Sequence, residues 1–428
     1  MPRSAFAATG TAASSRSIPP VISAIALVAA LYAWAVIALT PTHPGSIGLN
    51  LNALGTDWMV FWGGARWYFD GNLAALFDGN RFTAYLNTAF AGWLSQPMPF
   101  RPWVYPPTYL LIMLPFGSLP FTAGYVAFQV VTAALLAAAL WFRSDCPKAR
   151  GIVLTVALVG PAAAYNVGVG QNAFLTTALL VGGFRLLRTW PALGGILLGL
   201  LTLKPQFWLL VPVALFALRA WKGFFCSIAT AVALVLISAA VFGVDVWWNW
   251  IEFARGNYVD AHGQWVEMGR LWGVSLYACL VSAGTSQSVA NVVQFLGVVL
   301  GMALVYVAYR RPLSDDRKLA ALLACTFFAA PHSSLHDMVF LATAAALWTA
   351  EAANRDKPLA QWTLALAIWL APLINPPLVS LPGRFTPLLI LGFVAMTLTN
   401  RSTEDHDMPR LGSRAAPVPA VYLRESGK

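Results

Sequence analysis

The sequence contains few charged residues for its length. Only 10% of the 428 residues are Asp, Glu, Lys or Arg, whereas 58% are hydrophobic and the mean hydropathy is +0.66. Soluble globular chains carry about 25% charged residues, so this composition excludes a soluble protein. Apolar stretches of about 20 residues, the length of a membrane-spanning helix, recur along nearly the whole chain. We therefore predict an all-α polytopic membrane protein with no soluble catalytic domain.

Cysteine is also scarce. The four cysteines are isolated from one another in the sequence, at Cys146, Cys226, Cys279 and Cys325. This spacing matches neither a disulfide framework nor the clustered ligands of a zinc site. We predict no metal and no cofactor.

The net charge of +10 does not indicate a nucleic-acid partner, because most Lys and Arg residues lie in short connections between apolar stretches. Positive residues favour the cytoplasmic side, and placing these connections inside gives about twelve crossings with both termini in the cytoplasm. In this topology residues 1–20 and 401–428 are disordered cytoplasmic segments, and 21–400 form the membrane domain. The segment 106–116 must then be interfacial or re-entrant. The first apolar stretch, from Val21, exceeds the roughly 7–15 residues of a signal-peptide core, so we expect a retained helix.

This topology places two long loops, 41–105 and 244–288, on the extracytoplasmic face. The first loop mixes charges with many aromatic residues, which favours helices lying in the membrane interface. One helical stripe in it is predicted to be buried and comprises Trp58, Phe61, Trp62, Ala65 and Phe69.

Asp57 follows the first apolar span and begins this aromatic segment. A carboxylate at such a boundary can accept the proton of a substrate hydroxyl as a general base. The simpler interpretation is that Thr56 or Asp57 caps a helix.

Shorter polar turns lie on the same predicted face, at 165–172, 204–206 and 331–337. Ionisable groups at membrane depth are costly and often functional. Lys204 can bind an anionic phosphate, although a lysine can also extend to the lipid headgroups. His332 and His336 are four residues apart beside Asp337, as in some metal sites. However, Pro331 interrupts the segment and no further ligand cluster is near, so a phosphate-orienting histidine is favoured.

Four motifs in order resemble glycosyltransferase family 87. They are Gly55-Thr56-Asp57-Trp58-Met59-Val60-Phe61-Trp62, Tyr105-Pro106-Pro107, Gly170-Gln171-Asn172 and Lys204-Pro205-Gln206. This family belongs to the GT-C superfamily of membrane enzymes and includes polyprenol-phosphate-mannose-dependent mannosyltransferases. The resemblance runs from about Val21 to Asn400.

The resemblance implies a GT-C fold and the transfer of one sugar, mannose or another hexose, from a polyprenyl-phosphate donor. The acceptor would be a hydroxyl of a glycolipid or glycan on the extracytoplasmic face of a bacterial inner membrane, and no nucleotide sugar is needed. The family's catalytic acid falls on Asp57, which would act as general base in an inverting reaction. His336 and Asp337 stand where many members have Tyr-Asp.

The expected site therefore has three parts. The catalytic residue is Asp57. The expected ligands of the donor phosphate are Lys204, His336, Arg66 and Arg384. The other expected substrate-binding residues are Gln171, Asn172, Gln206, Tyr105, Asp337, His332 and Trp62.

Two alternatives use the same features. A flippase or transporter of lipid-linked sugars would also have many spans and a basic, aromatic cavity, but transporters commonly contain paired repeats, and none is evident here. An oligosaccharide ligase or polymerase, which moves a whole glycan from a lipid diphosphate, would fit the same cavity.

Overall fold

The computed structural model describes residues 18–39, 54–92, 94, 96–255, 273–353, 357–374 and 385–399. Within these ranges the chain is helical, and the only β-type pairing is an isolated bridge between Gly273 and Ser334. The prediction of an all-α protein is therefore confirmed for the described part of the chain.

The first half of the chain forms helices on both sides of the first polar loop. They are α1 (Pro20–Leu39), α2 (Thr56–Phe69), η1 (Leu73–Ala75), α3 (Gly79–Ala89), α4 (Pro107–Gly117), α5 (Phe121–Trp141), η2 (Pro147–Ala149), α6 (Arg150–Leu158), α7 (Pro161–Val169), α8 (Ala173–Leu186), α9 (Pro191–Leu200) and η3 (Leu201–Leu203).

The second half contains the longest helices and the most buried ones. They are α10 (Pro205–Trp208), α11 (Val211–Leu218), α12 (Trp221–Phe242), α13 (Val244–Ala254), α15 (Leu276–Ser282), α16 (Gln287–Arg310), α17 (Asp315–Ala329), η4 (Leu335–Met338), α18 (Val339–Ala352), α19 (Leu359–Ile374) and α20 (Thr386–Thr399).

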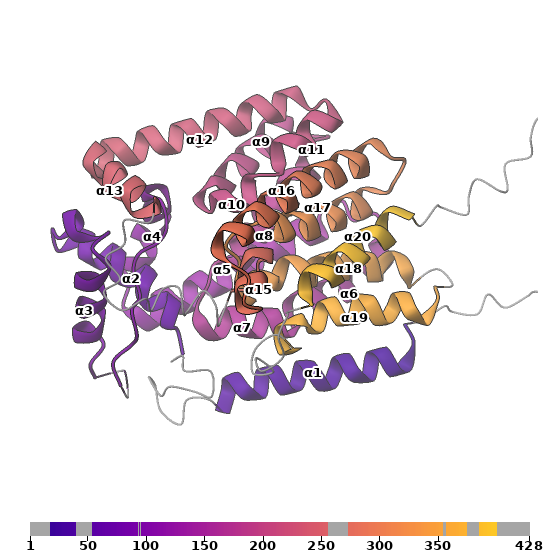
Figure 1. Cartoon of the computed structure of the whole chain (residues 1–428), viewed down its shortest axis with the longest axis horizontal. Helices are drawn as coiled ribbons and strands as arrows, with labels where there is room; N and C mark the ends of the chain where they lie inside the picture. The colour runs from indigo at the N-terminus through magenta and orange to yellow at the C-terminus, as the bar shows by residue number, and fades with distance from the viewer. Residues whose placement is uncertain are drawn as a thin grey trace, which may run out of the picture.

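Different helices lie at the two ends of this helical assembly. Helices α2, α3 and α13 gather at one end, and the start of α1 and the end of α20 lie at the other (Figure 1). Helix α17 packs against α16, α18 and α20 in the centre. The polar residues carried by the turns at the first end can therefore meet, although they are far apart in sequence.

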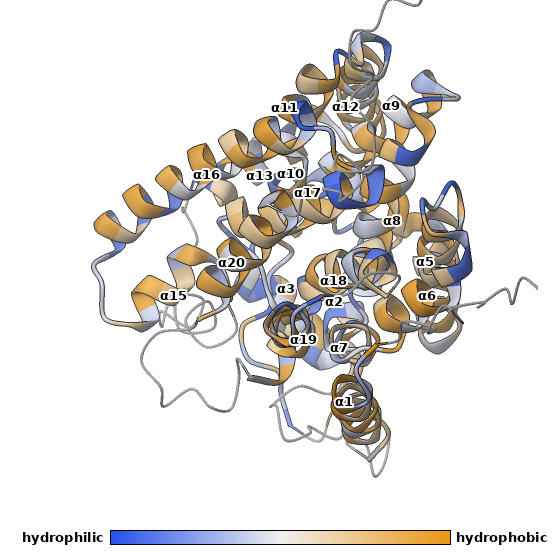
Figure 2. Ribbon diagram, turned by 90° about the vertical axis from the view of Figure 1, so that its right-hand side faces the viewer, coloured by the Kyte–Doolittle hydropathy of each residue, from blue (hydrophilic) through white to orange (hydrophobic). Residues whose placement is uncertain are grey.

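Side-chain exposure indicates which helices face lipid. Large apolar side chains are exposed on α1, α5, α12 and α16, for example Val28, Val130, Leu236 and Phe295, whereas α17 and α18 are almost wholly buried. Apolar residues predominate along the outer helix α16 (Figure 2). A chain with such an apolar exterior is a multi-pass membrane protein.

Four described helices are long and apolar enough to cross a membrane, namely Pro20–Ala38, Phe121–Trp141, Trp221–Phe242 and Gln287–Arg310. A bent pair, Pro147–Leu158 with Pro161–Val169, brings the number to five. The other apolar helices are shorter, so the twelve crossings and the interfacial position of the first-loop helices stay predictions. Helix α4 has 11 residues and a length of about 16 Å, too short to span alone, and the interfacial or re-entrant position of this segment stays a prediction.

The predicted stripe of α2 is buried at three of its five positions. Trp58, Phe61 and Ala65 are at most 1% exposed, whereas Trp62 is only partly buried and Phe69, the last residue of the helix, is 46% exposed. The helical period therefore located the packed face at the start of α2 but not at its end.

Candidate active site

Asp57 lies in the first turn of α2. The N-cap of this helix is Gly55, whose φ of 72° is unfavourable for residues with a side chain, so Asp57 is not the N-cap. The Gly55 N–H donates a 2.8 Å hydrogen bond to the carbonyl of Gly168 at the end of α7. This bond joins the start of α2 to the turn that carries Gln171.

The Asp57 carboxylate has two polar neighbours. Its Oδ2 accepts a 3.0 Å hydrogen bond from Nε2 of Gln171, and its Oδ1 lies 3.9 Å from a guanidinium nitrogen of Arg101. The Asp57 side chain is 20% exposed. It is thus oriented by protein groups and still accessible to a substrate.

Gln171 is fixed by the turn between α7 and α8. Gly170 closes α7 with φ 77°, and the Gln171 carbonyl accepts a 2.9 Å hydrogen bond from Nε2 of Gln129. The side-chain Oε1 of Gln171 accepts hydrogen bonds from the Tyr105 hydroxyl at 3.2 Å and the Asn172 N–H at 3.1 Å. Because its Oε1 faces these donors, Gln171 presents its amide N–H to Asp57. Burial raises the pKa of Tyr105 well above its usual value, so Tyr105 stays a hydrogen-bond donor.

Lys204 occupies the turn between η3 and α10 and is 5% exposed. Its Nζ donates to Oδ1 of Asp337 at 2.6 Å and to Oδ1 of Asn172 at 3.2 Å. The ammonium also lies 5.1 Å from the ring centre of Phe207 and 5.8 Å from that of Tyr105. Lys204 therefore lies in a buried ion pair and does not extend to lipid headgroups.

Asp337 is held by the short helix η4. Ser334 and Asp337 form a capping box, in which Oδ2 of Asp337 accepts a 3.1 Å bond from the Ser334 N–H. His336 Nε2 lies 3.4 Å from the same oxygen. Burial alone would raise the pKa of Asp337, but the charges and hydrogen bonds of His336 and Lys204 hold it well below its usual range. Asp337 is thus a carboxylate that compensates nearby positive charge.

The two histidines occupy different surroundings. The His336 ring is nearly parallel to that of Tyr165, with ring centres 6.5 Å apart. The carbonyl of His332 accepts a 3.5 Å bond from Gln206, and burial lowers the pKa of its imidazole. Within the described residues, no group of three or more His, Cys, Asp or Glu side chains is arranged to hold a metal ion.

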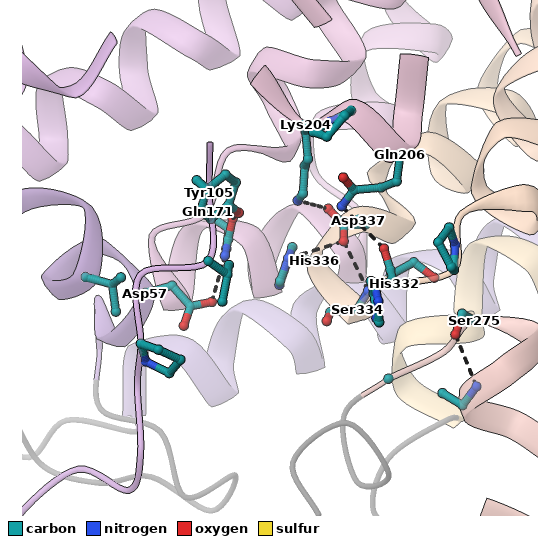
Figure 3. Close-up of a pocket in the computed structure, with 18 of the residues that line it drawn as sticks. Asp57, Tyr105, Gln171, Lys204, Gln206, Ser275, His332, Ser334, His336 and Asp337 are labelled. Atoms are coloured by element: carbon teal, nitrogen blue, oxygen red, sulfur yellow. Dashed lines mark hydrogen bonds and ion pairs between the residues drawn. The ribbon is translucent and has the colours of Figure 1, made fainter. Parts of the chain in front are cut away.

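These side chains line one cavity of about 720 Å³. Asp57 and Gln171 lie on one side of it, and Lys204, Asp337 and His336 lie on the other (Figure 3). The cavity size is typical of sites for small molecules. A carboxylate that can accept a proton therefore faces a buried, charged cluster across a space large enough for a sugar.

Comparison with known proteins identifies the family of this chain. A model of glycosyltransferase family 87 matches residues 103–335, which is more than half of the chain. The chain belongs to glycosyltransferase family 87. No curated protein and no solved structure matches it. The family assigns glycosyltransferase activity to the protein and confirms the resemblance for the three motifs within the matched residues, at Tyr105, Gly170 and Lys204. The motif that contains Asp57 lies before the matched residues, so the role of Asp57 stays a prediction.

The structure of this family 87 member brings most of the predicted site residues together. Those that line the cavity are Asp57, Tyr105, Gln171, Lys204, Gln206, His332, His336 and Asp337. Asn172 is buried directly behind them and accepts a hydrogen bond from Lys204.

Two predicted residues, Trp62 and Arg66, are not brought to this cavity, and the structure does not describe a third, Arg384. The Trp62 indole donates to the carbonyl of Leu119 and does not line it. Arg66 lies 3.8 Å from Asp70 on the exposed side of α2, because its position in the helical turn points it away from the buried stripe that leads to the cavity. Arg384 lies outside the described residues, as do positions 256–272 of the second long loop.

Sequence analysis missed one residue beside Asp57. Arg101 lines the cavity with its side chain 14% exposed. In the sequence Arg101 is one of several charged residues of the first long loop. It differs from the others only by its closeness to Asp57 in space, which the sequence does not reveal. The second long loop, 244–288, also contributes to the lining of the cavity, for example through Trp250, Ser275 and Tyr277.

Proposed function

We propose that this glycosyltransferase transfers a single sugar from a polyprenyl-phosphate-linked donor to a hydroxyl of a glycolipid or glycan. Asp57 acts as general base, and the product is inverted at the anomeric carbon. The observation that carries this proposal is the cavity itself, in which Asp57 is separated from the cluster of Lys204, His336 and Asp337.

The reaction we propose is a single displacement. The acceptor hydroxyl gives its proton to the Asp57 carboxylate while its oxygen attacks the anomeric carbon. The bond from that carbon to the phosphate oxygen breaks on the opposite side, and the polyprenyl phosphate leaves with the bonding electrons. Base catalysis of this kind contributes about 10²- to 10⁴-fold.

Asp57 suits the role of base because its orientation is fixed from both sides. Gln171 donates to Oδ2, and Arg101 lies near Oδ1. A base held in one orientation needs no reorganisation when the acceptor arrives.

The departing phosphate requires positive charge. Lys204 and His336 are the proposed ligands, with Arg101 as a further cation on the Asp57 side. Asp337 already compensates Lys204 at 2.6 Å, so the phosphate shares this ammonium with Asp337. Such fixed charges stabilise a leaving anion without a metal ion. Extracytoplasmic transfer in a bacterial inner membrane, and mannose or another hexose as the sugar, are part of the same proposal.

The test is sugar transfer by the full-length protein in proteoliposomes, with radiolabelled polyprenyl-phosphate mannose and a lipid extract as acceptor. Asp57→Asn should lower kcat by at least about 10²-fold with little change in unfolding temperature. Asp70→Asn is the matched control, because Asp70 lies on the exposed side just after α2 and does not line the cavity.

Near-normal transfer by Asp57→Asn would refute the assignment of the base. A protein that transfers label only from oligosaccharide diphosphate lipids would be a ligase or polymerase instead, and the single-sugar proposal would be wrong.

A further inference from the structure

A second cavity of about 440 Å³ lies at the far end of α8 from Gln171. Gln171 precedes this helix, and Arg185 lies near its other end. Fourteen residues of helix correspond to about 21 Å, so this cavity is separate from the site of Asp57. It is formed where the α5–η2, α8–α9 and α11–α12 connections meet the first turn of α17.

Cations outnumber carboxylates in this second cavity. Its charged lining residues are Arg143, Arg185, Arg188, Lys318, Asp145 and Asp315. Arg188 forms a 2.9 Å ion pair with Asp315 at the surface. Within the described residues, Arg143 and Lys318 form no ion pair. Asp145 is a lining carboxylate that also forms no ion pair among the described residues, so two unpaired cations and one unpaired carboxylate leave the cavity positively charged.

Two residues that line the cavity also carry buried hydrogen-bond donors without partners in the described structure. One is the hydroxyl of Tyr309, a residue that is 6% exposed, and the other is Nε of Arg185, whose side chain is 2% exposed. The remaining guanidinium nitrogens of Arg185 are occupied, since one donates to the Arg143 carbonyl at 2.6 Å and the other pairs with Asp316. A buried donor without an acceptor destabilises the fold, so a ligand that brings acceptor oxygens to both groups would bind favourably.

The backbone at Arg143 is strained. Its φ of 50° lies in the left-handed region, which is unfavourable for residues other than glycine. This conformation directs the Arg143 carbonyl to Arg185 and leaves its side chain at the cavity. Strain of this kind is concentrated at binding and active sites.

We propose that this second cavity binds a phosphate group. A phosphate offers several acceptor oxygens to the Tyr309 hydroxyl and the Arg185 N–H, and its negative charge matches Arg143 and Lys318. Phospholipid headgroups and soluble phosphates carry the same group, and basic pockets between helices bind anionic headgroups in other membrane proteins. The site is independent of the sugar-transfer reaction.

The test uses the purified full-length protein and three probes, dihexanoyl phosphatidic acid, dihexanoylglycerol and inorganic phosphate. Phosphatidic acid should bind and raise the unfolding temperature, and dihexanoylglycerol, which lacks the phosphate, should not. Lys318→Gln and Tyr309→Phe should each raise the Kd about fivefold or more. Tyr309→Phe should not lower the unfolding temperature of the unliganded protein, because it removes a donor that lacks a partner.

Lys222→Gln is the matched control, because Lys222 is an exposed lysine at the start of α12 that does not line the cavity. Competition by inorganic phosphate would identify a soluble phosphate as a ligand, and binding of phosphatidic acid without competition would identify the lipid. Either result supports the phosphate site. The proposal is overturned if neither phosphatidic acid nor inorganic phosphate binds. It is also overturned if Lys222→Gln weakens binding as much as Lys318→Gln, or if Tyr309→Phe leaves the Kd unchanged.

Discussion

We expect substitution of Lys204 and substitution of Asp337, the two partners of a buried ion pair, to destabilise the protein by different amounts. Their charged atoms are 2.6 Å apart, and the side chains are 6% and 3% exposed. Removing one partner of a buried pair leaves an uncompensated charge and costs about 3–5 kcal/mol. The two substitutions differ, however, because the two charges have different remaining partners.

Lys204→Met leaves Asp337 with the Ser334 N–H and His336. Asp337→Asn leaves the Lys204 ammonium beside aromatic rings, with the neutral oxygen of Asn172 as its remaining hydrogen-bond acceptor among the described residues. We expect Asp337→Asn to lower the free energy of unfolding by the upper part of the range, about 4–5 kcal/mol, and Lys204→Met by about 3 kcal/mol. The double variant should be less destabilised than the sum of the two.

The measurement is denaturant unfolding of the purified protein in detergent, followed by tryptophan fluorescence, with the coupling obtained from the double-mutant cycle. Both single variants should also lose sugar transfer, because the cluster forms one wall of the cavity. The reasoning is refuted if each single change costs less than about 1 kcal/mol, or if the two effects are strictly additive. Either result would mean that solvent reaches the pair.

Two further predictions concern the turns around the cavity. Burial lowers the pKa of His332 below 6.5, so the unfolded protein binds a proton at this residue more readily than the folded protein does. The stability contributed by neutral His332 is therefore present above pH 6.5 and is lost as the pH falls below it. Between pH 8 and pH 5 the free energy of unfolding should fall less in His332→Gln than in the wild type, and the same pH dependence in both proteins would contradict this. Gly170→Ala would place a Cβ 2.4 Å from Cβ of Trp58 at a φ of 77°. This substitution should lower the free energy of unfolding by about 2–4 kcal/mol and reduce sugar transfer. In the control Gly182→Ala the new Cβ would meet its neighbours at 3.5 Å, so the unfolding temperature and the transfer rate should stay near wild type.

Much of the fold was accessible from composition and turn chemistry. The scarcity of charge identified a membrane protein, and the polar turns at Gly170, Lys204 and Pro331 were located between helices, where the structure has them. The number of crossings was not accessible, because several apolar helices are short or broken, as at the 49° bend between α6 and α7. Hydropathy measures how apolar a stretch is, and it does not report where a helix bends.

The site was predicted through its motifs, and its internal contacts were not. The partner of Lys204 lies 133 residues away in the sequence, and periodicity carries no information about such a pairing. Trp62 and Arg66 were expected at the cavity because they lie near Asp57 in the sequence, yet the helical turn directs them elsewhere. Arg101 was missed for the converse reason, since only the path of the loop after α3 brings it to within 3.9 Å of Asp57.

The hydrogen bond between Gly55 and Gly168 fixes the start of α2 to the end of α7. Asp57 and the turn of Gln171 are joined through the main chain, so they form a single rigid unit. The position of the Asp57 carboxylate therefore depends on how α7 packs among the other helices, and a displacement of α7 would move Asp57 and Gln171 together.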